Sequence, residues 1–316
     1  MNKFKDFFCT FVFMDLYTKT LEFFYSKFLS ETTKKRTEKV FVTISIISFL
    51  LHLLLILLVN LKIINAYSKL LIEPISAIYT PFSFILIYEV YLLVFYLPKS
   101  TTIYIGKQYE IITLIIIRRN FKDLSKLDFT GVNLYSKVNL NFAFDLLTTL
   151  ILFYLIYIFY KLDTVNNEIK SLKEKTIEVD RFIKFKNAIA VFLIPIFLIL
   201  SFYSLGNWIY ESFTITQIVK NIKDINKIFF DDFFTILILI EVLLLLFSFY
   251  ITDKFNKVIR NSGFIISTIL IKLSFGTEGI LNSTLIVIAV LFGVLILKIH
   301  NYFEVEEIKQ RIKKTS

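Results

Sequence analysis

The fold is decided by residues 233–298, which read FFTILILIEVLLLLFSFYI (233–251), TDKFNKVIRNSG, FIISTILIKLSF (264–275), GTEG (276–279) and ILNSTLIVIAVLFGVLILK (280–298). The first and last apolar runs are long enough to cross a membrane, because ~30 Å of hydrocarbon takes about 20 helical residues. The run 264–275 is too short for this and is predicted to be a half-length helix, re-entrant or interfacial. Irregular backbone at membrane depth is tolerated only where protein buries it or where it lines a water-filled cavity. The order of full helix, half helix, turn and full helix therefore predicts a two-helix, pore-like module.

Composition places the rest of the chain in a bilayer as well. The 316 residues are 56% hydrophobic with a mean hydropathy of +0.69, and they include only 7 glycines and 4 prolines. The apolar residues must then lie in long uninterrupted runs. Runs long enough for a membrane helix occur at 40–59, 75–97, 142–160, 188–208, 233–251 and 280–298. We therefore predict an all-α, polytopic membrane helix bundle of about six transmembrane helices, in contact with lipid.

The predicted spans divide the chain into four parts. Residues 1–39 form an N-terminal segment, predicted to be a Phe-rich amphipathic helix on the membrane surface or an ordinary helix packed on the bundle. Residues 40–210 form a four-helix membrane domain. Residues 211–300 contain the pore-like module, and residues 301–316 form a basic tail.

The segment 98–141 is predicted to be a cytoplasmic loop, but its pattern allows two structures. It contains the apolar patch IITLIII (111–117), followed by Arg118 and Arg119. Such a patch is typical of a surface helix whose long cationic side chains reach back to the membrane interface. The same patch could also insert into the bundle.

The segment 161–186 carries apolar residues at alternating spacings of three and four. This pattern is typical of a short coiled coil. The stripe consists of Leu162, Val165, Ile169, Leu172, Thr176, Val179 and Ile183. It predicts either homo-oligomerisation or packing against the rest of the chain.

The net charge of +10 indicates an orientation in the membrane and not a nucleic-acid partner. Lysine and arginine mark the cytoplasmic side of a polytopic protein. With both termini in the cytoplasm, the basic residues 34–39, the loop 98–141 and the tail lie inside. The segment 161–186, with seven basic residues, then falls outside. If it is cytoplasmic, this topology is wrong at the third span. Abundant Lys, Ile, Asn and Phe suggest a microbial inner or plasma membrane.

No residue pattern points to catalysis. The single cysteine, Cys9, excludes an intrachain disulfide. His52 and His300 are far apart in sequence and belong to no HExxH or other metal-ligand spacing. Neither a GxSxG motif nor a phosphate-binding loop occurs. We therefore predict no enzyme activity, no metal site and no cofactor.

Ionisable residues inside predicted membrane helices carry more information. A carboxylate in hydrocarbon costs ~2.5 kcal/mol or more, so it is expected to face a partner or water. The intramembrane charged candidates are Glu89, Asp145, Glu241 and Lys272. Glu241 and Lys272 form either a structural ion pair or part of an ion pathway. Asp145 is near the start of its span, so it lies either in the hydrocarbon region or in the interface region.

This arrangement resembles the six-helix voltage-gated-like cation channel superfamily. The resemblance has three parts: the four-plus-two layout, the acidic residues Glu89 and Asp145 in the second and third spans, and the SFGTEG sequence (274–279) after the half helix. It implies a pore surrounded by four subunits or repeats. It also implies a filter at the turn, where a ring of carboxylates attracts monovalent or divalent cations. The corresponding residues here are Gly276, Thr277, Glu278 and Gly279.

Departures from that family limit the expected function. The span 188–208 has no arginine or lysine, so it lacks the gating charges of a voltage sensor. Lys272 would oppose cations if it faced the pore, and the SFGTEG sequence can also be a plain turn of a helical hairpin. The expectation is a homo-oligomeric, voltage-insensitive cation channel. Two alternatives stay open: a non-conducting scaffold, sensor or effector, and a secondary transporter, which broken spans in two related halves would favour.

Overall fold

The computed structural model describes residues 19–64, 71, 74–124, 137–171, 177–214, 225–251, 255–277 and 279–315. Within these residues the secondary structure is helical, without strands. The elements are α2 (Lys19–Phe28), α3 (Glu31–Asn60), the short 3-10 helix η2 (Pro74–Ile78), α4 (Tyr79–Tyr96), α5 (Thr101–Leu124), α6 (Lys137–Ser171), α7 (Ile177–Thr214), α8 (Ile225–Ile251), α9 (Phe255–Phe275) and α10 (Ile280–Thr315). The predicted all-α class is confirmed.

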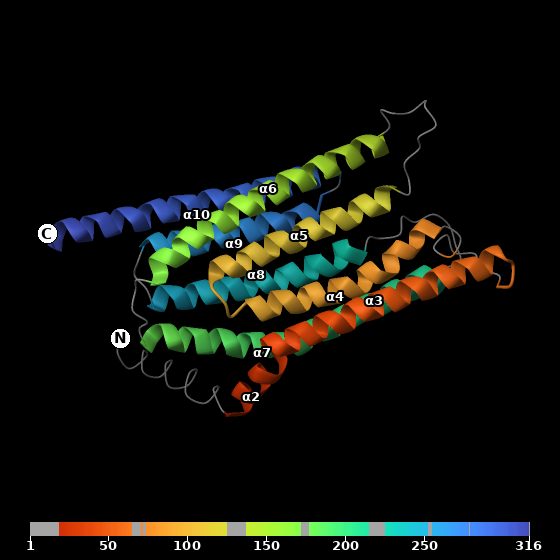
Figure 1. Ribbon diagram of the computed structural model, residues 1–316, viewed down its shortest axis with the longest axis horizontal. Helices are drawn as coiled ribbons and strands as arrows, with labels where there is room; N and C mark the ends of the chain where they lie inside the picture. The colour runs from red at the N-terminus through yellow and green to blue at the C-terminus, as the bar shows by residue number, and fades with distance from the viewer. Residues whose placement is uncertain are drawn as a thin grey trace.

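The long helices α3 to α10 lie roughly side by side, and consecutive helices run in opposite directions (Figure 1). Contacts between neighbours close a ring in the order α4, α5, α6, α10, α9, α8, α7 and back to α4. Helix α3 lies outside this ring against α4, and α2 packs on α7 and α3. Helix α5 also contacts α9 and α10, so it faces the middle of the ring.

The described residues include six helices that are long and apolar enough to cross a membrane. They cover Glu31–Asn60, Asn139–Thr164, Phe182–Ser204, Asp232–Phe249, Phe255–Phe275 and Ile280–Glu307. Large apolar side chains are exposed along their outer faces, as contact with lipid requires. The chain is an integral membrane protein with a polytopic helix bundle.

Helix α9 is longer than the half-length helix predicted from the sequence. It begins at Phe255 and not at Phe264, and its 21 residues extend over ~32 Å. The polar residues before Phe264 are accommodated because Arg260 is buried and hydrogen-bonded to His300 on α10. Helices α9 and α10 pack along each other as an antiparallel hairpin. The half-length, re-entrant prediction is therefore corrected to a full-length helix.

Helix α5 lies within the segment 98–141, for which the sequence pattern allows either a cytoplasmic loop with a surface helix or a helix inserted into the bundle. The structure has the inserted helix. Between residues 101 and 121, only Leu114 and Phe121 are exposed. The 24 residues of α5 reach ~36 Å, which is enough to cross the hydrocarbon layer. Together with the shorter apolar helix α4, α5 extends the ring beyond the six apolar helices.

The segment 161–186 is divided between two helices. Helix α6 ends at Ser171, α7 begins at Ile177, and the two run in opposite directions (Figure 1). Residues 172–176, which include Leu172 and Thr176 of the heptad stripe, lie outside the described residues. One continuous coiled-coil helix over 161–186 is therefore excluded. Of the N-terminal segment, residues 1–18 also lie outside the described residues.

Candidate functional site

Helix α5 supplies a side-chain partner to every intramembrane carboxylate predicted from the sequence. Each carboxylate lies on a different helix that packs near α5, and each accepts a hydrogen bond from it. The pairs are Glu89 with Arg118, Asp145 with Arg119, and Glu241 with Gln108. Buried charges require such partners, because the hydrocarbon interior offers no water. Sequence reasoning found the carboxylates but not their partners, because 98–141 was not assigned to a span.

The pair between Glu89 and Arg118 joins α4 to α5. Arg118 Nη2 donates to Glu89 Oε2 at 2.7 Å, and the two side chains are only 3% and 4% exposed. The opposite charges of Glu89 and Arg118 neutralise each other. Among the described residues, Nε and Nη1 of Arg118 have no hydrogen-bond partner. The pair is thus a fixed structural link, and removal of either partner would leave a buried charge uncompensated.

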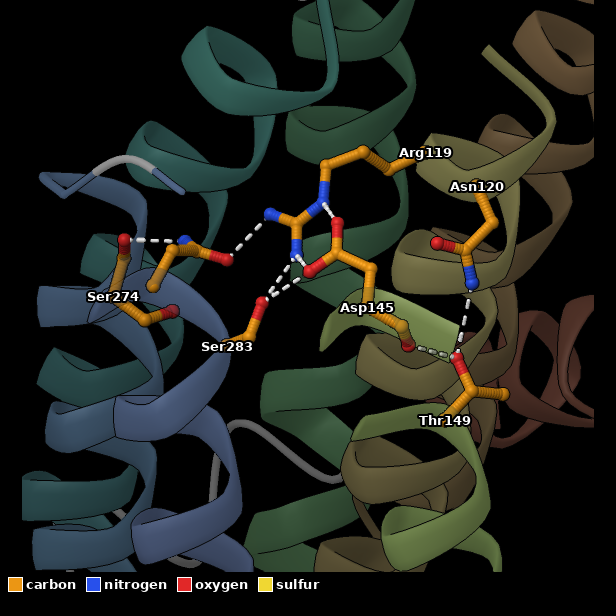
Figure 2. Close-up of polar contacts among 7 residues, drawn as sticks. Arg119, Asn120, Asp145, Thr149, Ser274 and Ser283 are labelled. Carbon is orange, nitrogen blue, oxygen red and sulfur yellow. Dashed lines mark hydrogen bonds and ion pairs between the residues drawn. The ribbon is translucent and has the colours of Figure 1, made fainter. Parts of the chain in front are cut away.

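Arg119 is the centre of a larger polar cluster, shown in Figure 2. Its Nε and Nη2 donate to the two carboxylate oxygens of Asp145 at 2.6 and 2.8 Å, a bidentate geometry that strengthens the pair. Arg119 also donates to Asn282 Oδ1 at 2.6 Å and to Ser283 Oγ at 2.7 Å. Asn282 Nδ2 in turn donates to the backbone oxygen of Ser274 at 2.5 Å. We call these five residues the Arg119 cluster; it ties α5, α6 and α10 to the end of α9.

The predicted filter turn lies next to the Arg119 cluster. Thr277 donates to the backbone oxygen of Ser274 through its hydroxyl at 2.8 Å and through its amide at 3.0 Å, while the Gly276 amide donates to Leu273 O. These bonds satisfy carbonyls at the end of α9, as helix termini require. Gly279 has a φ of +61°, which favours glycine. Glu278, the acidic residue of the turn, lies outside the described residues.

Glu241 has a different environment from the other two carboxylates. Its Oε1 accepts from Gln108 Nε2 at 2.5 Å, and Gln108 Oε1 accepts from Thr268 Oγ1 at 2.9 Å. Its Oε2 is buried and has no hydrogen-bond partner within the described residues. In the same part of the chain no ion pair joins Glu241 to Lys272, which is half-buried. Glu241 is therefore held by a neutral amide and not by a cation.

A small cavity lies beside Glu241. Its volume is about 30 Å³, and its polar lining consists of Thr101, Tyr104, Lys186, Glu241 and Asn261. A single water needs ~10–15 Å³ measured in this way, so the cavity has room for one or two water molecules. Its apolar walls come from Leu97, directly after α4, and from α5, α7, α8 and α9.

Helix α9 presents a row of buried hydroxyl groups along its length. Ser267, Thr268 and Ser274 are completely buried. The Ser267 hydroxyl shares a hydrogen bond with Tyr109 on α5 at 2.8 Å and donates to Ala289 O on α10 at 2.7 Å. We call these three residues the α9 hydroxyl row. Between Thr268 and Ser274 it is interrupted by Ile271, which is also completely buried.

In the part of the chain that the structure describes, no group of three His, Cys, Asp or Glu side chains could hold a metal ion. His52 hydrogen-bonds Thr80, and His300 bonds Arg260 and Asn256. The two histidines thus belong to separate helix contacts. The chemistry available to the site is that of carboxylate, amide, hydroxyl and ammonium groups.

The chain matches no protein-family model, no curated protein and no solved structure. Fold and site alone therefore define its class. It is an integral membrane protein, an all-α polytopic bundle. Among the residues that the structure describes, the intramembrane carboxylates predicted from the sequence are the paired Glu89 and Asp145 and also Glu241, which forms no ion pair with a lysine or arginine.

Proposed function

We propose that this integral membrane protein moves cations across the bilayer, without voltage gating, through the interior of its helix ring. Glu241 is the observation that carries the proposal. Ionisable residues are rare and expensive inside membranes, and they mark ion pathways and proton relays. Within the described residues, Oε2 of the buried Glu241 carboxylate accepts no hydrogen bond, and Glu241 lines a water-sized cavity. The Glu241 carboxylate can therefore bind a cation or a proton reversibly.

A purely structural role explains Glu89 and Asp145 better than it explains Glu241. Each of the first two is neutralised by an arginine within 2.7 Å. A carboxylate that only held helices together would be expected to have its charge balanced in the same way. Glu241 instead has Gln108 as its hydrogen-bond partner, and within the described residues no lysine or arginine forms an ion pair with it, so a cation or a proton can bind there.

The path for cations in this proposal follows the interface of α5 and α9. It runs from the cavity beside Glu241, along the α9 hydroxyl row, to the Arg119 cluster at the α9–α10 turn. In this proposal Ile271, which is completely buried between Thr268 and Ser274 in the sequence of α9, is the residue that closes the path. A channel that opens by moving α9 and a carrier that alternates between two conformations both fit this arrangement.

Glu278 is proposed to act at the mouth of the path, where Gly276, Thr277 and Gly279 shape the turn. A carboxylate in that place raises the local concentration of cations. Assembly of several chains around one axis would bring these turns together as a ring. The homo-oligomer is part of this proposal.

Both termini are proposed to be cytoplasmic, in an inner or plasma membrane. If α4 and α5 both cross the membrane, the connection between α6 and α7 lies on the same side as the termini. The seven basic residues of 161–186 are then inside, together with those of 34–39 and of the C-terminal tail. Orientation by positive charge then holds without the exception that six spans produced.

Ion flux in liposomes tests the proposal. We expect wild-type protein to conduct or exchange cations, and Glu241→Gln to reduce the rate by at least about tenfold, the effect of ~1.4 kcal/mol. Glu306→Gln is the matched control, because Glu306 is exposed near the end of α10. No flux of H⁺, Na⁺ or K⁺ from the wild-type protein would contradict the proposal, and so would full activity of Glu241→Gln.

A further inference from the structure

The cavity beside Glu241 contains two buried polar atoms that lack partners within the described residues. They are Glu241 Oε2 and Tyr104 Oη, on side chains that are 6% and 3% exposed. A buried polar atom without a partner is unfavourable, because it has lost its hydrogen bonds to water. Both residues line the same cavity, so one small ligand can satisfy both atoms. Water has this ability, because it donates to a carboxylate and accepts from a phenol.

The size of the cavity favours a proton over a metal cation as the ligand of Glu241. The polar groups that bond to Glu241 or share its cavity are Gln108, Tyr104 and Thr101 of α5, Asn261 of α9 and Lys186 of α7. The Lys186 ammonium is the cationic group among these, and it opposes a metal ion and a proton alike, so space and not charge decides between the two. A cavity of about 30 Å³ leaves no room for a hydrated metal ion. A proton needs neither a coordination shell nor extra space.

Lys186 connects the cavity to the end of the bundle. It donates from Nζ to the backbone oxygen of Lys99 at 2.9 Å. Lys99 lies in the short connection between α4 and α5, and its side chain is 40% exposed. Lys186 therefore reaches from the cavity lining to the connection between α4 and α5.

We propose that Glu241 is a proton-binding site that exchanges its proton through water in this cavity, at the Lys186 end of the bundle. A proton delivered by cavity water forms an O–H bond at Glu241 Oε2 and leaves a neutral carboxylic acid. Release returns the proton to water, and the Lys186 ammonium then faces the carboxylate across the cavity. No group is oxidised or reduced. This inference rests on the proposed function, because it names the proton as the cation that Glu241 binds.

Infrared difference spectroscopy tests this site directly on the full-length protein in lipid. We expect a fall in pH to produce the carbonyl stretching band of a protonated carboxylic acid, and the band to shift in D₂O. Glu241→Gln is expected to remove this band, whereas Glu306→Gln is expected to retain it. Absence of the band from wild-type protein would overturn the proposal, as would its persistence at full intensity in Glu241→Gln.

A second variant guards against a simple loss of folding. Tyr104→Phe removes only the hydroxyl that shares the cavity with Glu241 and keeps the ring in place. We expect it to retain the band at a shifted frequency, because the hydrogen bonding of the acid changes. An unchanged frequency would show that Tyr104 and Glu241 share no ligand and would overturn the water-filled site.

The infrared result is independent of transport. A Glu241 band without any ion flux would retain the proton site and reject the proposed function. Flux that depends on Glu241 without the band would retain the proposed function and reject the proton site.

Discussion

At the scale of single residues, the bundle neutralises buried charge in two ways. Glu89 and Asp145 are each paired with an arginine of α5, and those pairs hold α4 and α6 against α5. Glu241 is bonded to the neutral side chain of Gln108 and, within the described residues, forms no ion pair with a lysine or arginine. A charged pair of fixed geometry holds helices in register, while a carboxylate with a free oxygen can change its protonation. The difference predicts different consequences of mutation at the three sites.

Removal of Arg118 is expected to destabilise the protein because Glu89 would be left buried and unpaired. Arg118→Met should lower the free energy of unfolding by ~3–5 kcal/mol, the usual effect of breaking a buried pair. The double variant Arg118→Met with Glu89→Leu should recover most of this loss, since no charge then remains. Thermal unfolding in detergent measures both. If the double variant is as unstable as the single one, packing and not charge determines the effect.

Gly293 on α10 is a second sensitive residue. A Cβ atom placed there would lie 1.8 Å from the Tyr109 hydroxyl, so Gly293→Ala must displace Tyr109 and break its bond to Ser267. We expect a clear fall in the unfolding temperature. Gly206→Ala is the matched control, because nothing lies within 4 Å of its Cβ position and alanine favours a helix by about 0.5–1 kcal/mol. Equal unfolding temperatures for the two variants would contradict the close contact of α5 with α10.

At the scale of elements, α9 combines a lipid-facing side with the hydroxyl row. Ile271→Ala is expected to open the row between Thr268 and Ser274 and to increase ion flux several-fold. It should also reduce stability by ~2–5 kcal/mol, as for other buried isoleucines. Ile266→Ala, on the exposed side of the same helix, should change neither property much. Reduced or unchanged flux in Ile271→Ala, with the protein still folded, would place the path elsewhere.

The elements also show what can be predicted from this sequence and what cannot. Long apolar runs were sufficient to predict the helical class and most of the spans. Helix α5 was ambiguous because Lys107, Glu110, Arg118 and Arg119 reduce its hydropathy, although Lys107 and Glu110 bond each other and the arginines bond carboxylates of other helices. Those pairs join residues far apart in sequence, and one sequence contains no signal for them.

The start of α9 was misplaced for the same physical reason. The predicted apolar run begins only at Phe264, because the charged Arg260 precedes it. In the bundle, however, Arg260 is buried and hydrogen-bonded to His300. Among the candidate site residues, Glu241 is buried within the apolar helix α8, and its hydrogen-bond partner is Gln108 and not Lys272. The filter assignment of the turn, including Glu278, stays a prediction.

At the scale of the whole molecule, consecutive helices alternate in direction, and α5 and α9 raise the number of crossings from the six predicted from the sequence to eight. With both termini inside, as proposed, six crossings place the residues after α6 outside the cell, whereas eight crossings place them inside. The difference depends on α5 alone, because every later helix changes side with it until α9 restores the original order. The orientation of the whole chain can therefore be tested at one position.

Cysteine labelling tests this topology in intact cells. In a Cys9→Ser background, a membrane-impermeant maleimide should label Lys62→Cys, in the turn after α3, from outside. Ser171→Cys, at the end of α6, and Lys309→Cys, in the tail, should react only after permeabilisation, because eight crossings place both inside. If Ser171→Cys reacts from outside while Lys309→Cys does not, α5 does not cross the membrane. Glu89 and Asp145 would then meet their arginines at the surface, and the interior path along α5 would have no basis.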